Sequence, residues 1–147
     1  MLLTLAMLPV TEDAFVFNAK LADDQEEPWR TRRMAYTWFG LHQDPRGRPF
    51  PGALRDDPDP ERRITALYVL AQLGEPSALE PVSQILKQGP PSSYRDVLLL
   101  SLAELTTPED FVLRAPASLE WSGGYKHSLL YARYRNAGTD DKTSICQ

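Results

Sequence analysis

The chain is poor in the side chains from which metal sites are usually built. Its 147 residues include one cysteine, Cys146, and two histidines, His42 and His127. A single cysteine excludes an internal disulfide. A zinc site needs three or four converging ligands, which two distant histidines and one thiol do not supply. The sequence therefore predicts that the protein folds without a metal and without an organic cofactor.

Motifs for phosphate binding and nucleophilic catalysis are also missing. The chain has no glycine-rich phosphate loop, no dinucleotide-binding turn and no nucleophile elbow. A general base needs a partner group, and the sequence offers none to either histidine. Asp57, Asp59 and Glu61 alternate with prolines, but they lack the central glycine and the closing glutamate of a calcium loop. We therefore predict that the protein is not an enzyme.

Positive charge is not in excess. The chain has 16 Lys and Arg against 20 Asp and Glu, a net charge of −4. Nucleic-acid binders present clustered Lys and Arg to the phosphates, so nucleic acid is not an expected partner. The charges lie in blocks, acidic over residues 12–27 and 56–61 and arginine-rich over residues 30–48. Such blocks usually face solvent, but the acidic ones also suit a basic partner.

No apolar run is long enough to cross a bilayer. The first eight residues are apolar, but Pro9 ends the run, and no basic residue or small-residue cleavage site marks a signal peptide. We therefore expect a core segment and a cytoplasmic protein that does not enter the membrane. Two interpretations of residues 1–22 stay open. Thr11 is a suitable helix N-cap before Glu12, yet Phe15 to Leu21 also alternate as a strand does.

What the sequence does contain is an internal repeat. A shift of 32 residues places Arg63 on Arg95 and Pro76 on Pro108, and four apolar positions match between them. Repeats of this length are typical of stacked helical hairpins, because one hairpin buries its apolar face only against a neighbour. The matched arginines predict an ion pair with an acid of the preceding repeat.

The first copy resembles a HEAT repeat. Asp57-Pro58-Asp59-Pro60 precedes a helix that begins with Arg residues, and Gly74-Glu75-Pro76-Ser77-Ala78-Leu79 leads into its partner. The second copy departs from the pattern, with Thr106-Thr107-Pro108 in place of Gly-Asp-Pro and a break at Ala115-Pro116. The resemblance thus covers residues 57–108. It implies an all-α fold, a short right-handed α-solenoid of two to three HEAT-like hairpins with atypical N- and C-terminal segments.

Apolar spacing and turn residues predict where the helices lie. The expected helices are 30–43, 59–73, 77–88, one capped by Ser92 or Ser93 and running to Leu105, a short one starting at Thr107, and 126–135. Five prolines argue against regular structure between Asp44 and Pro60. Residues 121–125 are expected to form a turn. We predict one domain over residues 1–138 and a polar tail over residues 139–147.

Two groups of residues are candidates for binding a partner. Trp29, Trp121 and Tyr125 lie near Pro or Gly-Gly, where an aromatic side chain can anchor an interface or cap the end of the stack. The second group is acidic, lies near the predicted helix starts and is expected to line one edge. It comprises Asp56, Asp57, Asp59, Glu75, Glu109 and Asp110.

Two functions are compatible with this resemblance. A stack of hairpins offers a binding surface, so the first is a non-enzymatic protein-interaction module. Its most concrete form is a bacterial cytoplasmic immunity protein, antitoxin or inhibitor that blocks a basic toxin or enzyme. The alternative is a HEAT-like lyase or accessory subunit of the bilin lyase type, for which a visible absorbance band would be the sign. The sequence leaves the oligomeric state open.

Overall fold

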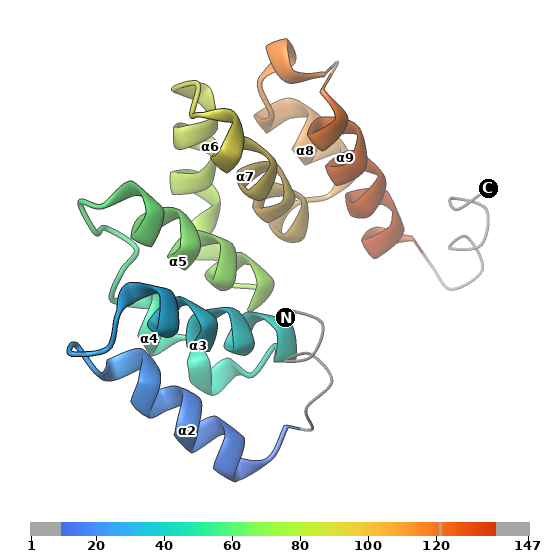
Figure 1. Cartoon of the computed structure of the whole chain (residues 1–147). Helices are drawn as coiled ribbons and strands as arrows, with labels where there is room; N and C mark the ends of the chain where they lie inside the picture. Colours follow the sequence, from blue (N-terminus) through green and yellow to red (C-terminus); the bar gives the residue numbers. More distant parts are fainter. Residues whose placement is uncertain (1–9, 121, 138–147) are drawn as a thin grey trace. The chain divides into compact units, whose positions relative to one another are not determined.

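The structure is a computed structural model that describes residues 10–120 and 122–137. Within these ranges every regular element is helical (Figure 1), which confirms the all-α prediction. In chain order the elements are α2 (Glu12–Asp23), α3 (Trp29–His42), η1 (Pro45–Gly47), α4 (Pro49–Gly52), α5 (Pro60–Gln72), η2 (Pro76–Ala78), α6 (Leu79–Lys87), α7 (Ser92–Leu105), α8 (Pro108–Arg114), η3 (Ala117–Leu119) and α9 (Gly123–Asn136). None of the described helices combines the length and apolar character needed to cross a bilayer.

The chain divides into two compact units. Unit 1 is Met1–Leu73 and unit 2 is Gly74–Gln147. The boundary falls at the turn after α5, where Gly74 adopts a left-handed conformation with φ of +69°. Glycine takes this conformation without steric cost, which explains why the helix ends there, as the sequence predicts.

The first described helix of unit 1 is α2, and this settles the open choice for its residues in favour of a helix. The Thr11 hydroxyl oxygen accepts the Ala14 backbone N–H at 3.1 Å, so Thr11 is the predicted N-cap. Ala22 is buried, and Phe15 and Ala19 pack half-buried against the core. The alternating pattern that favoured a strand arises because Phe17 points outward and is 61% exposed. Residues 1–9 lie outside the described part.

Helices α3 and α5 pack against each other and run parallel. Arg33 pairs with Glu61 near the start of both helices, and Gly40 lies against Gln72 near the end of both. Close packing at Gly40 is possible because glycine has no Cβ. Trp38 and Phe39 of α3 are fully buried. On α5, the residues Ile64, Leu67, Leu70 and Ala71 are also buried.

The proline-rich segment between α3 and α5 contradicts one expectation. Residues 44–60 contain the 3-10 turn η1 and the four-residue helix α4. Pro45 and Pro49 each stand in the first turn of one of these elements, where the missing N–H has no helical partner to lose. The proline count was therefore the wrong indicator here, because prolines at helix starts favour a turn of helix.

Unit 2 repeats the parallel arrangement with α7 and α9. Asp96 lies against Gly124 near their starts, and the Tyr131 hydroxyl donates to Glu104 at 2.7 Å further along. The core residues of α7 are Leu98, Leu99, Leu102 and Ala103, and α8 adds the fully buried Phe111. On α6, Val82 and Leu86 are buried, whereas Leu79 and Ile85 are half-buried.

Two helix starts in unit 2 differ from the predictions. Ser92 and Ser93 lie inside α7, and the N-cap position belongs to Pro91, which makes no side-chain cap. Residues 123–125 form the first turn of α9 rather than a turn between aromatics, because the Ser122 hydroxyl caps the Tyr125 backbone N–H at 3.1 Å. A suitable N-cap outweighed the helix-breaking tendency of Gly123 and Gly124.

The repeated arginines do not form the expected ion pairs. The Arg63 guanidinium donates to the backbone carbonyl of Asp57 at 2.8 Å. Among the described residues neither Arg63 nor Arg95 is within ion-pair distance of a carboxylate. Arg63 therefore ties the loop before α5 to the helix, a local role rather than one between repeats.

Candidate partner-binding surface

The loop that leads into α5 builds its acidic surface from capping interactions. Asp57 Oδ1 accepts the Asp59 backbone N–H at 2.8 Å, and Asp59 Oδ1 accepts the N–H groups of Glu61 and Arg62 at 2.9 and 3.1 Å. These bonds satisfy backbone donors that have no partner inside the helix. They also hold two carboxylates of unit 1 in fixed positions at the start of α5.

Trp29 of α3 lies beside this helix start. The Arg62 guanidinium lies over the Trp29 ring, 5.6 Å from its centroid, and the ring packs on Tyr36 at 5.8 Å. Trp29 is half-buried, and its indole N–H is buried without a hydrogen bond within the described residues. The indole thus belongs partly to the core and partly to the surface.

We call Trp29, Asp56, Asp57, Asp59 and Arg62 the Trp29 edge. The Asp56 side chain is 83% exposed and lies 3.4 Å from Arg55. Ion pairs at this exposure contribute little to stability. The edge therefore combines an aromatic surface with carboxylates, of which Asp56 is held least firmly.

The predicted acids of unit 2 lie in different surroundings. The Glu75 carboxylate caps η2 through the Ser77 N–H at 3.4 Å. Asp110 is paired by both oxygens with Arg114 Nε at 2.9 Å, so an internal arginine already offsets its charge. Because α8 and η2 belong to unit 2 and the loop before α5 belongs to unit 1, the expected single acidic edge stays a prediction.

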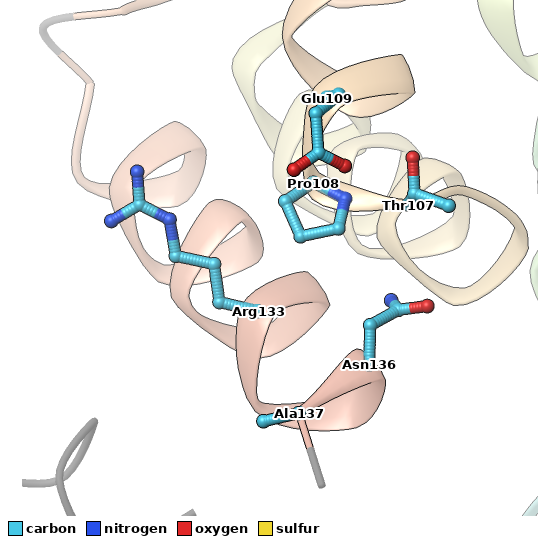
Figure 2. A pocket seen from close by; sticks show the side chains of 6 residues that line it. All are labelled: Thr107, Pro108, Glu109, Arg133, Asn136 and Ala137. Carbon is cyan, nitrogen blue, oxygen red and sulfur yellow. The ribbon is translucent and has the colours of Figure 1, made fainter. Parts of the chain in front are cut away.

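Glu109 borders an open cavity of about 420 Å³ in unit 2. Figure 2 shows Glu109 from α8 and Arg133 from α9 at its rim. The other lining residues are Thr107, Pro108, Asn136 and Ala137. One acid and one base at an open rim provide no set of converging groups for a defined small ligand.

The other two aromatic candidates are Tyr125 and Trp121. Tyr125 is 5% exposed and packs on Phe111, with ring centroids 5.3 Å apart. Burial raises the pKa of the Tyr125 hydroxyl, with a further contribution from Glu120. A side chain so buried has little surface to offer a partner. Trp121 lies outside the described residues, as do Cys146 and the predicted tail over residues 139–147.

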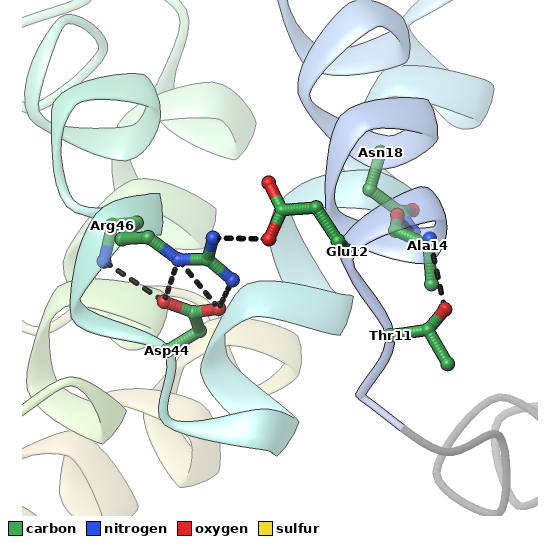
Figure 3. Close-up of polar contacts among 6 residues, drawn as sticks. All are labelled: Thr11, Glu12, Ala14, Asn18, Asp44 and Arg46. Atoms are coloured by element: carbon green, nitrogen blue, oxygen red, sulfur yellow. Dashed lines mark hydrogen bonds and ion pairs between the residues drawn. The ribbon is translucent and has the colours of Figure 1, made fainter.

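Sequence reasoning missed a polar cluster that fastens α2 to the segment after α3. The Arg46 guanidinium donates to Asp44 at 2.8 Å and to Glu12 at 2.7 Å (Figure 3), and it lies 3.9 Å from the Phe15 ring centroid. The hydrogen bond from Arg46 is the main reason why the pKa of Asp44 lies below its ordinary value. The two carboxylates in turn raise the pKa of Arg46. Glu12 and Arg46 are 34 positions apart, and nothing in the local pattern links them.

Two helices also expose apolar side chains outside the predicted site. Val16 and Phe17 on α2 are 43% and 61% exposed, and Leu130 and Tyr134 on α9 are 45% and 43% exposed. A helical projection of the sequence hints at this, because both pairs lie opposite the buried residues of their helices.

The described residues bring together no group of three or more His, Cys, Asp or Glu side chains that could hold a metal ion. His42 packs its ring against Trp38, with centroids 4.6 Å apart, and is half-buried. His127 is exposed on α9. The two histidines therefore belong to different units.

The family model for HEAT repeats matches residues 19–103, more than half of the chain. The match includes the resemblance over residues 57–108 almost completely, and it extends toward the N-terminus to take in α3. Comparison with curated proteins gave no match, and neither did comparison with solved structures.

Proposed function

This chain belongs to the HEAT-repeat family, and from this premise we propose that it is a non-enzymatic protein-binding module that holds its partner at the Trp29 edge. HEAT repeats commonly mediate protein–protein binding. The observation that carries the proposal is the position of the half-buried indole beside Arg62, in the first turn of the helix whose start Asp57 and Asp59 hold.

The chemistry of the edge favours a basic partner. Tryptophan is a frequent anchor of protein interfaces, since a large ring buries much area at little cost in conformational entropy. Carboxylates around such an anchor attract basic surfaces from a distance and raise the association rate. Arg62 and Arg55 limit this field, so the attraction rests mainly on Asp56, Asp57 and Asp59.

The finer form of the proposal is an inhibitor. A small acidic module that covers a basic functional surface blocks it by occupancy, as an immunity protein or antitoxin does. This step is supported by charge and size alone and by analogy with such proteins. Its test is whether the chain, added in equimolar amount, abolishes the activity of the partner it captures.

The binding test compares three variants on a partner recovered from native lysate by the full chain. Changing Asp56, Asp57 and Asp59 together to Asn keeps the capping oxygens and removes the charge. We expect a lower association rate and a weaker dependence on salt in surface plasmon resonance. Trp29→Ala is expected to increase the dissociation rate and to weaken binding by about 2 kcal/mol. The melting temperature of each variant checks that unit 1 stays folded.

The control is a triple change of equal charge in unit 2, Glu80→Gln, Asp96→Asn and Glu120→Gln. It should leave the association rate close to that of the unchanged chain. If both triple variants slow association equally, net charge rather than the Trp29 edge attracts the partner. Unchanged kinetics in the Asn triple variant and in Trp29→Ala would refute the proposal.

A further inference from the structure

The outer face of α2 is apolar and acidic. Val16 and Phe17 are 43% and 61% exposed, one turn from the exposed Asp13. With its C-cap, the helix carries four exposed carboxylates and one lysine, and Arg46 pairs with one of the carboxylates, Glu12, which leaves a net charge of −2. These charged residues are Glu12, Asp13, Asp23, Asp24 and Lys20.

The outer face of α9 is apolar and basic. Leu130 and Tyr134 are spaced by four residues and so lie on one side of the helix, 45% and 43% exposed. Lys126 and Arg133 lie on the same side, and all three basic residues of the helix, with Arg135 as the third, are exposed. The helix contains no acid, so its net charge is +3.

These two helices are the first and the last that the structure describes. In a repeat stack the outer faces of the end helices are normally polar, because an apolar end face invites a further layer. Here the outer face of each of these two helices presents two apolar side chains, and the net charge of the helix is negative for α2 and positive for α9. We propose that α2 of one copy docks on α9 of a second copy, so that the chain associates head to tail.

The charges of the two helices favour the α2–α9 contact over the two-fold contacts α2–α2 and α9–α9. A two-fold dimer through α2 would bring two acidic helices together, and one through α9 would bring two basic helices together. Like charges facing each other across an interface oppose association. Only the α2–α9 pairing joins opposite charges around the two apolar pairs. Such a contact uses different patches on the two copies, so each associated pair retains one α2 face and one α9 face for further copies.

The test uses the full chain in reducing buffer, since Cys146 could otherwise link two copies. Sedimentation equilibrium at low ionic strength should show an average mass that rises with protein concentration. High salt should weaken the association, because the charges of both faces are exposed. Phe17→Lys puts a positive charge on the α2 face, where it would meet the basic α9 face of a second copy. Leu130→Glu puts a negative charge on the α9 face, where it would meet the acidic α2 face. Each variant alone is expected to associate about tenfold or more weakly.

The decisive measurement mixes the two variants. The Phe17→Lys copy retains an intact α9 face, and the Leu130→Glu copy retains an intact α2 face, so the mixture should form 1:1 pairs through one intact contact, which neither variant alone can form. Leu41→Lys on α3 and Leu113→Glu on α8 are matched controls, since both residues are exposed apolar positions outside the two faces. Both should associate as the unchanged chain does.

Three results would overturn the proposal. The first is a full chain that stays monomeric up to about 1 mM. The second is a single variant that associates normally, because the contact needs both faces. The third is a mixture that stays as dissociated as its components. None of these outcomes depends on the Trp29 edge, so the proposal stands or falls separately from the proposed function.

Discussion

Asp44 shows how one buried carboxylate stabilises unit 1. Its side chain is 8% exposed and is held by Arg46, which also reaches Glu12 on α2. Asp44 Oδ1 in addition accepts the Arg46 backbone N–H at 3.0 Å, which caps η1. A carboxylate with these bonds favours its charged form, and this is why its pKa is lowered.

The pKa shift of Asp44 predicts a pH dependence of stability. Because its folded pKa lies below the unfolded value of about 3.9, Asp44 stabilises the protein above that value. This contribution is lost as the pH falls through the folded pKa. We expect Asp44→Asn to reduce the drop in unfolding free energy between pH 7 and pH 3, measured by urea denaturation. Glu26→Gln, a change at an exposed loop position, should leave that drop unaltered.

At the scale of elements, a helix boundary could be predicted from the sequence where the residues that determine it lie within or next to the helix. The start and end of α5 were predictable because Asp59 caps it and Gly74 ends it, both within its own segment. The start of α9 was not predicted correctly, because Gly123 and Gly124 favoured a turn although Ser122 caps the helix. The parallel packing of α3 on α5 rests on tertiary contacts such as Arg33 with Glu61, which no spacing rule reveals.

The candidate site follows the same division. Capping by Asp57 and Asp59 follows from Asp-Pro spacing, so their positions could be predicted. The position of Arg62 over Trp29 could not be predicted, because it depends on the packing of two helices. Tyr125 was a candidate because it follows two glycines, yet its ring is buried, since helix α9 begins before it.

The contact between η1 and α3 provides a test of packing between elements. Gly47 is buried, and a Cβ atom there would lie 2.6 Å from the Phe39 Cβ and 2.5 Å from its Cγ. These atoms belong to the base of a fully buried side chain, so the backbone would have to move. We expect Gly47→Ala to lower the unfolding free energy by about 1–3 kcal/mol. Gly52→Ala has no atom within 4 Å of its new Cβ and should be neutral or slightly stabilising.

At the scale of the whole molecule, the prediction of one domain over residues 1–138 can be tested with one buried leucine in each unit. Leu67 in unit 1 and Leu99 in unit 2 are both fully buried. Each Leu→Ala change should cost about 2–5 kcal/mol. If the chain unfolds as one domain, calorimetry will show a single transition that both changes lower.

Two resolved transitions, each lowered by only one of the substitutions, would contradict the single-domain prediction and make the units independent in folding. Leu113→Ala serves as the control, because this side chain is 82% exposed. Its effect should stay below about 0.5 kcal/mol.

The parallel packing of helices has an electrostatic consequence. Parallel helices place the positive ends of their dipoles side by side, whereas antiparallel helices alternate them. Neither α3 nor α9 has an acid in its own first turn. For α9 the negative charge comes from its neighbour, since Asp96 of α7 lies against Gly124. Asp96 is therefore placed to act as a counterion for the start of α9, whether or not a partner binds the chain.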